Sequence, residues 1–243
     1  MKEVSPFSNK KDPKTLAAYT LGEARRYLQI PEATLKSWLV GRYYPTSKGR
    51  KFFKPLIAPA SQDRQLGLSF LNLVEAHVLD AIRRTHGVTL PKVRSAMDYI
   101  GRELHSKHPL AEKDFETDGV DLFVHHYGKL INVSREGQMA IKQVLEAYLA
   151  RIERDASGVA ARLYPFTRNR AASAAVRTEP RTVLIDPSIS YGRPVVAGTG
   201  IPTSALAERY KAGDSIKSLA DDYSLSTDAI EEAIRCELWT EAA

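Results

Sequence analysis

Cysteine is nearly absent from this chain of 243 residues, with Cys236 as the single one. An internal disulfide framework is therefore excluded. No stretch approaches the roughly 18 uncharged apolar residues of a membrane helix, and the first residues, MKEVSPFSNKKDPK, lack the apolar core of a signal peptide. We therefore expect a soluble, cytoplasmic protein.

Signatures of nucleotide chemistry are also missing. The most glycine-rich stretch, SYGRPVVAGTGIP at residues 190–202, has no lysine after its glycines, which a P-loop requires. Thr203 stands where a dinucleotide fingerprint has its third glycine, and no βαβ unit surrounds it. Both nucleotide-binding interpretations fail, and the glycines are better explained as a compact bend.

Metal and catalytic groups are equally sparse. His125 and His126 fall on opposite faces of an expected strand, while His105 and His108 have no cysteine or carboxylate to complete a ligand set. Cys236 lies in an amphipathic helical pattern, where a lone cysteine ordinarily packs, so a hydrolase that uses it has little support. We expect no metal, no cofactor and no enzyme activity.

Charge is unevenly distributed along the chain. The whole sequence carries a formal charge of +6 with a pI near 9.3. Residues 1–60 hold twelve Lys and Arg against four Asp and Glu, residues 61–180 are close to balanced, and residues 181–243 hold six against ten. The basic amino-terminal part indicates a polyanionic partner, and the acidic carboxy-terminal part indicates a different partner.

Residues 20–40, TLGEARRYLQIPEATLKSWLV, contain two short helical patterns separated by a tight turn. Thr20 and Glu23 form a capping box before the first, and Pro31 suits the first turn of the second. The second helix turns Leu35, Trp38 and Leu39 inward. Its opposite face carries small, hydroxyl and basic side chains, namely Ala33, Lys36, Ser37 and Val40 with Thr34 on the flank. That character is typical of a helix that enters the major groove.

Basic and aromatic residues follow directly, in GRYYPTSKGRKFFKPLI. The segment Ser47 to Gly49 predicts a turn between two extended runs, and therefore a hairpin wing suited to phosphate and sugar contacts. The alternative is a solvated basic surface on an ordinary helical hairpin. The residues predicted to contact DNA are Arg25, Thr34, Lys36, Ser37, Arg42, Tyr43, Lys48, Arg50 and Lys51.

The phrases YTLGEARRYLQIPEATLKSWLVGR and KPLIAP, with the later LSFLNLVEAHVLDAIRR and GVTLPKVRSAMDYI, resemble the MerR-like winged helix-turn-helix domain of a group of VapB-type antitoxins. The resemblance covers residues 15–105, and it implies a DNA-binding domain with its dimer helices.

Residues 66–84 are apolar on several sides, which indicates a helix buried on several faces. We expect this helix to be the seam of a homodimer, and a core helix within one subunit is an equally good interpretation. A further helix is predicted from Pro91, with Val93, Met97 and Ile100 on its apolar stripe.

Residues 112–155 predict a small α+β region. GVDLFVHHYGKLINV at 119–133 is interpreted as a hairpin with its turn at Tyr127 to Lys129, and Ser134 caps a helix whose stripe runs from Ile141 to Ile152. Residues 156–181, rich in Ala, Ser, Arg and Pro, predict a linker with one docked segment around Leu163, Tyr164 and Phe166.

Residues 182–243 predict two short strands, TVLIDP and GRPVVAG, followed by three helices. Gly213 ends the first helix, Ser215 caps the second and Ser226 caps the third. The motifs Asp186-Pro187, Gly192-Arg193-Pro194, Gly198-Thr199 and Ile201-Pro202 resemble the homeodomain-like modules of domain of unknown function 433, over residues 182–236. Gly200 departs from that family, which usually has Arg or another polar residue there.

The second resemblance implies an antitoxin module encoded beside a PIN-like ribonuclease. The residues expected to bind that toxin are Arg193, Asp221, Asp222, Asp228, Glu231 and Glu232. The expected fold is mainly α with short β hairpins: a winged helix-turn-helix, a small α+β middle region and a carboxy-terminal homeodomain-like three-helix module.

We therefore predict an antitoxin of a type II toxin–antitoxin system that neutralises a PIN-like ribonuclease toxin and represses its own operon by binding double-stranded operator DNA. No membrane partner is expected. The alternative is a free-standing MerR-like transcriptional regulator whose acidic carboxy-terminal part binds a ligand or another protein. A PIN-like gene next door would separate the two hypotheses.

Overall fold

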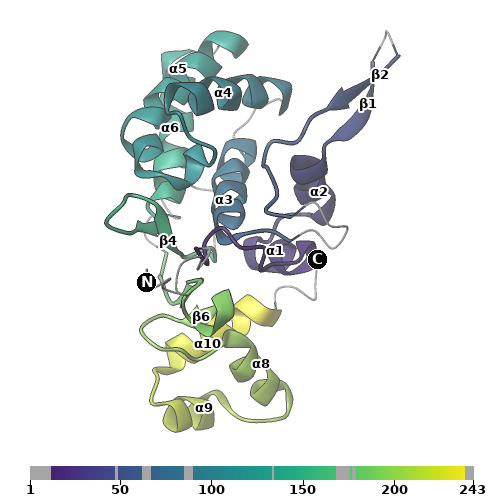
Figure 1. The fold of residues 1–243 in the computed structure, drawn as a ribbon. Helices are drawn as coiled ribbons and strands as arrows, with labels where there is room; N and C mark the ends of the chain where they lie inside the picture. Colours follow the sequence, from purple (N-terminus) through teal and green to yellow (C-terminus); the bar gives the residue numbers. More distant parts are fainter. Residues whose placement is uncertain are drawn as a thin grey trace, which may run out of the picture.

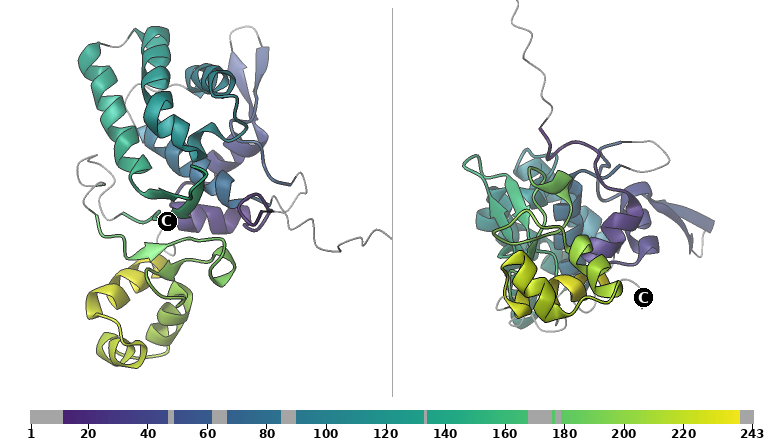
Figure 2. Two further views of the ribbon diagram at one scale, coloured as in Figure 1. Left: turned by 60° about the vertical axis from the view of Figure 1, so that its left-hand side comes forward. Right: turned by 90° about the horizontal axis from the view of Figure 1, so that it is seen from below.

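The structure is a computed structural model, and it describes residues 12–46, 49–61, 67–84, 90–132, 134–167, 176 and 179–238. It is mainly helical, with short antiparallel strand pairs. Figure 1 shows the β1–β2 hairpin at one end of the molecule and the module of α8, α9 and α10 at the other. Helices α4, α5 and α6 lie beside the hairpin at the same end, and α1 lies nearest the module, as the left-hand view of Figure 2 also shows.

The predicted helix-turn-helix and wing are confirmed. Helix α1 (Leu21–Leu28) starts at the capping box, in which the Thr20 hydroxyl accepts from the Glu23 amide at 3.2 Å and the Glu23 carboxylate accepts from the Thr20 amide at 2.8 Å. Gln29 ends it in the left-handed conformation. Helix α2 (Glu32–Val40) follows Pro31. Strands β1 (Arg42–Thr46) and β2 (Gly49–Phe53) pair antiparallel as the wing, whose turn residue Lys48 lies outside the described residues.

Helix α3 (Phe70–Arg84) is the core helix of one subunit, so its prediction as a dimer seam is wrong. Every residue from Phe70 to Ile82 is buried within the single chain. The surrounding elements are α1, α6 (Arg135–Leu149), the short 3₁₀ turn Pro109–Ala111 and β4 (Ala160–Leu163). The apolar residues on several faces meet the chain's own helices, which leaves no face for a second copy.

The hairpin expected at 119–133 is also wrong, because residues Val120–Ile131 form helix α5. Val120, Phe123, Val124 and Tyr127 are buried at the 3,1,3 spacing of a helix, and a π-helical turn, Phe115–Gly119, leads into it. Helix α5 packs on α4 (Leu90–Glu103), which confirms the predicted helix from Pro91, and on α6. Helix α6 begins at the predicted Ser134 cap but ends at Leu149, before Ile152.

The segment 156–181 is more structured than the predicted linker. Strand β3 (Ile152–Arg154) pairs with β4, and Leu163, Tyr164 and Phe166 are buried, which confirms a docked segment. The buried Arg151 guanidinium donates to the carbonyls of Tyr164 and Phe166 (2.9 and 2.7 Å) and of Glu179 and Pro180 (2.8 and 3.1 Å). Burial lowers the pKa of Arg151 to about 10. The Arg151 side chain thus holds the backbone at Tyr164 and Phe166 and again at Glu179 and Pro180.

The carboxy-terminal module follows the prediction closely. Strands β5 (Val183–Leu184) and β6 (Val195–Val196) pair antiparallel around a short 3₁₀ turn, Ser190–Gly192. Helices α8 (Thr203–Lys211), α9 (Ile216–Tyr223) and α10 (Thr227–Leu238) follow. The hydroxyls of Ser215 and Ser226 accept from the amides of Ser218 and Ala229, which confirms both predicted caps.

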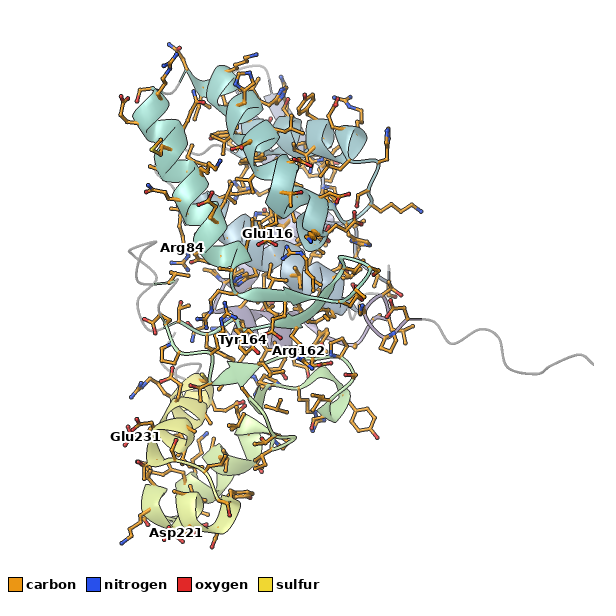
Figure 3. All side chains as sticks on the ribbon, turned by 90° about the vertical axis from the view of Figure 1, so that its left-hand side faces the viewer. Arg84, Glu116, Arg162, Tyr164, Asp221 and Glu231 are labelled. Atoms are coloured by element: carbon orange, nitrogen blue, oxygen red, sulfur yellow. The ribbon has the colours of Figure 1, made fainter. Side chains whose placement is uncertain are left out.

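The module is joined to the rest of the chain by backbone and side-chain contacts. Leu163 and Ile185 exchange two backbone hydrogen bonds of 3.0 and 2.8 Å, and Arg162 pairs with Asp186 at 3.0 Å. Figure 3 shows Arg162 and Tyr164 where the middle region meets the module. Gly192 lies so close to the Tyr19 hydroxyl that a Cβ at this position would come within 2.1 Å of it.

Replacing Val74 by aspartate should unfold the protein rather than yield folded monomers. The Val74 side chain is 0% exposed within one chain, so a carboxylate there is desolvated without a partner and should cost about 3 kcal/mol or more. Chemical denaturation measures the loss. The exposed Val40→Asp is the control and should change the free energy of unfolding by less than about 0.5 kcal/mol. A folded, monomeric Val74→Asp protein would restore the dimer-seam hypothesis.

The pair of His108 and Glu75 should make stability depend on pH. The buried Glu75 carboxylate lies 3.2 Å from the His108 imidazole, between Oε2 and Nδ1, and its interaction with the imidazole raises the pKa of His108. A group whose folded pKa lies above its unfolded value of about 6.5 stabilises the fold fully below that value, and the contribution is lost as pH rises through the folded pKa. His108→Gln should therefore lower the melting temperature more at about pH 6 than at about pH 9.

The exposed His125→Gln on α5 is the matched control, and its melting temperature should follow that of the unaltered protein at both pH values. An equal loss for His108→Gln at both pH values would show that the imidazole contributes packing alone.

Candidate nucleic-acid interface and carboxy-terminal binding surface

Helix α2 presents one exposed face to solvent. Ala33, Lys36 and Val40 are exposed on it, and Thr34 is half-buried beside them. Ser37 was predicted on this face, and that prediction is wrong because its side chain is only 6% exposed. Ser37 lines a cavity with Arg83 and Leu90, so the end of α3 and the start of α4 cover a flank that a single-helix projection leaves open.

The wing beside α2 carries cations and aromatic rings together. Tyr43 on β1 is opposite Phe52 on β2, with ring centroids 5.0 Å apart, and Tyr43 is 68% exposed. Arg42, Arg50 and Lys51 are exposed on the same two strands. Exposed rings beside cations provide stacking and packing surface next to groups that attract phosphate.

A cavity of about 430 Å³ lies between α2 and the end of α3, with Arg42 and Arg83 in its lining. Thr34 and Ser37 add hydroxyls to the same lining. Arg83 was not predicted from the sequence, because it lies far from α2 along the chain and only the fold brings it into this lining. Arg25 is half-buried on α1, outside this cavity. Apart from Arg25, the described DNA candidates lie on α2 and the wing, and the structure adds Arg83 at the end of α3.

The acidic candidates on the module fall into two groups. Asp221, Asp228 and Glu231 are exposed, and Figure 3 shows Asp221 and Glu231 on the outer part of the module. Asp222 is also exposed, but its carboxylate accepts from Arg209 at 2.6 Å, and the hydrogen bonds of Arg209 to Asp222 and Asp214 raise the pKa of that guanidinium. Glu232 is only 6% exposed and pairs with Arg235 at 2.8 Å, so its place on the binding surface is a wrong prediction.

Arg193 is exposed on the bend between β5 and β6 and makes no ion pair with the residues that the structure describes. Its backbone is held by a hydrogen bond of 3.1 Å from its own amide to the Ser190 carbonyl. It lies in the loop that approaches Tyr19, whereas Asp221 and Glu231 lie on α9 and α10. The structure does not bring the predicted cation and the predicted acids into one cluster.

Comparison with known proteins separates the same two units. Residues 17–97 match the family described as "Putative DNA-binding HTH domain", and residues 183–235 match the family described as "Protein of unknown function (DUF433)". A protein of Mycobacterium tuberculosis named "Putative antitoxin VapB45" is 29% identical over 235 residues, which cover 89% of this chain and 92% of that protein. The chain therefore combines a unit similar to a helix-turn-helix family with a unit similar to the DUF433 family, and most of its length is similar to a protein named as an antitoxin.

The fold is also similar to a solved structure. The crystal structure of Rv2018 from Mycobacterium tuberculosis superposes with a TM-score of 0.63, and the match covers 90% of this chain and 97% of that one. The identity is 24%, so this likeness concerns the fold. It supports the order of a helix-turn-helix domain, a helical middle region and a carboxy-terminal module.

The described part of the chain contains no group of three or more His, Cys, Asp or Glu side chains placed to hold a metal ion. His125 and His126 lie on α5, where His126 stacks on Tyr99 with ring centroids 4.4 Å apart. Cys236 is buried in the core of the module. Within the described residues, no helix is long and apolar enough to cross a membrane.

Proposed function

We propose that this chain is an antitoxin, a binding protein rather than an enzyme, with a separate partner for each of its two units. Its helix-turn-helix domain binds operator DNA of its own operon as a repressor, and residues 182–243 bind and silence a PIN-like ribonuclease. The observation that carries this proposal is the placement of an exposed cationic wing at one end of the molecule and an acidic helical module at the other.

The charges of the two units support a different partner for each. Phosphate contacts require the cations and exposed rings of α2 and the wing, where Lys36, Arg42, Arg50 and Lys51 face solvent. The module carries exposed carboxylates, which repel DNA and attract the basic surroundings that a ribonuclease uses to bind RNA. The similarity to a protein named as an antitoxin supports the same assignment.

The proposal includes a homodimer on a palindromic operator, since helix-turn-helix proteins read half-sites in pairs. Because α3 is covered by its own chain, the contact between the two copies must use another surface. Localisation in the cytoplasm, beside the operator, belongs to the same proposal.

Lys36→Ala and Lys51→Ala should weaken DNA binding in different ways. Loss of the exposed Lys36 on α2 should lower discrimination at one base pair by roughly 1–3 kcal/mol, while loss of Lys51 on the wing should weaken binding to all sequences and flatten the salt slope by about one. Arg83→Ala should act as Lys51→Ala does. Fluorescence anisotropy with the protein's own promoter and with random DNA, over a range of salt, measures both effects.

Lys217→Ala, which removes an exposed cation from α9, should leave both measurements unchanged. Equal affinity of the unaltered protein for promoter and random DNA would refute the repressor proposal.

Neutralising the exposed acids of the module should impair protection from the ribonuclease. We expect Asp221→Asn, Asp228→Asn and Glu231→Gln together to weaken binding of the neighbouring nuclease at least tenfold, because three attractive charges at a complementary surface are lost. Point variants of the full chain are preferable to deletion of the module, since Leu163 pairs with Ile185. Growth during co-expression and isothermal titration calorimetry measure the effect.

The matched control replaces Glu103, Asp114 and Asp118, three exposed acids of the middle region, by their amides. Full protection by the control and by the module variant alike would place the nuclease contact away from these carboxylates.

A further inference from the structure

The bend between β5 and β6 contains three successive residues in the left-handed region. The φ angles of Ser190, Tyr191 and Gly192 are 47°, 57° and 74°. Glycine adopts this conformation readily, but serine and tyrosine do so at a cost in free energy, so such residues persist only where the surroundings impose them. Residues strained in this way cluster at functional sites.

Hydrogen bonds on both sides hold this bend in place. The amides of Gly192 and Arg193 donate to the carbonyls of Ile189 and Ser190 at 2.9 and 3.1 Å. The Ser190 hydroxyl donates to the Gly200 carbonyl at 3.0 Å, which ties the bend to the next turn. Gly192 lies against Tyr19, so a larger residue there would collide with the first domain. The tyrosine is therefore presented by a fixed backbone.

The Tyr191 side chain has no structural role that would repay this strain. It is 94% exposed, and it belongs to none of the hydrophobic clusters of the described residues. Arg193, two residues away, is exposed and makes no ion pair with the described residues. Tyrosine and arginine are, together with tryptophan, the residue types enriched among the dominant contacts of protein interfaces, and here both are exposed on one bend.

We propose that Tyr191 is the anchor of the surface that binds the ribonuclease, with Arg193 as its charged neighbour. This inference rests on the proposed function and names the surface on which it acts. The ring enters an apolar pocket of the nuclease, and the guanidinium pairs with carboxylates at the rim of that pocket. Because hydrogen bonds hold the bend at Tyr191 before binding, little backbone conformational entropy is lost there when the complex forms.

A nuclease cleft fits this surface better than DNA does. The bend belongs to a module whose exposed Asp221, Asp228 and Glu231 repel phosphate. The cationic wing, which is suited to DNA, lies at the opposite end of the molecule from the module, and α2 lies between the two (Figure 1). An aromatic and a guanidinium in an acidic module match a partner with both apolar and carboxylate groups.

The experiment uses the full chain and the nuclease encoded by the neighbouring gene, with calorimetry for the dissociation constant and thermal unfolding for stability. Tyr191→Ala should raise the dissociation constant about 30-fold or more, the change typical of a dominant interface residue. Tyr191→Gly should lose the same affinity while its melting temperature stays equal or rises, because glycine accepts the left-handed conformation. A merely structural tyrosine would give the opposite result, with affinity retained and stability lowered.

Two matched variants complete the test. Ser190→Gly removes the hydroxyl that ties the bend to the Gly200 carbonyl but keeps the tyrosine, so affinity should fall by less than in Tyr191→Ala if the ring is the anchor. Tyr210→Ala removes another exposed tyrosine of the same module, on α8, and should leave affinity unchanged.

Other results would overturn the proposal. Unchanged nuclease affinity in Tyr191→Ala and Tyr191→Gly refutes the anchor while leaving the antitoxin function intact, whereas no binding by the unaltered chain refutes both. A loss of operator affinity with nuclease affinity retained would assign the surface to DNA. A change of oligomeric state in Tyr191→Ala, measured by sedimentation, would assign it to a second copy of the chain.

Discussion

The burial of α3 from Phe70 to Ile82 is the constraint on which the rest of the structure depends. A helix segment covered on all sides must satisfy its polar groups internally, and α3 does so through its neighbours. The Asn72 side chain accepts from the amide of Ala60 and donates to the carbonyl of Ala58, which fixes the segment after the wing. His77 lies 3.3 Å from the Tyr148 carbonyl at the end of α6. Burial of one helix therefore positions both the DNA-binding unit and the middle region.

Two further contacts connect the carboxy-terminal module to the parts of the chain that α3 positions. Arg151 follows α6 directly and gathers four carbonyls from the segments before and after residues 168–175. The Leu163–Ile185 pairing then adds β4 to the edge of the module. Burying the Arg151 guanidinium costs solvation free energy, and the four hydrogen bonds offset this cost only when all four carbonyls are in place. Arg151 therefore couples the backbone at Tyr164 and Phe166 to the backbone at Glu179 and Pro180.

The two ends of the molecule differ in chemistry as well as in position. The helix-turn-helix end presents cations and rings on α2 and the wing, and the module presents separate exposed acids with a strained aromatic bend. The matches to two different families fall on the same two units. The likeness of nearly the whole chain to a protein named as an antitoxin supports the proposal that one chain has a nucleic-acid partner and a protein partner.

Local chemistry determined the elements that the sequence predicted correctly. The capping box of Thr20 and Glu23, the caps at Ser215 and Ser226, and the wing depend on residues within a few positions of one another. The exposed candidates Lys36, Arg50 and Lys51 were predictable because helix and strand periodicity alone turns them outward.

Contacts between distant segments decided the remainder. Residues 120–131 form a helix because α4 and α6 cover its buried face, although alternating apolar residues also favoured a hairpin. Ser37 and Glu232 are buried by elements that a single-helix projection does not contain, and α3 is covered by its own subunit. Arg83 comes to line a cavity with residues of α2, and Gly192 comes to lie against Tyr19, only once the chain is folded. Periodicity assigns a residue to a face, and only tertiary packing determines what covers that face.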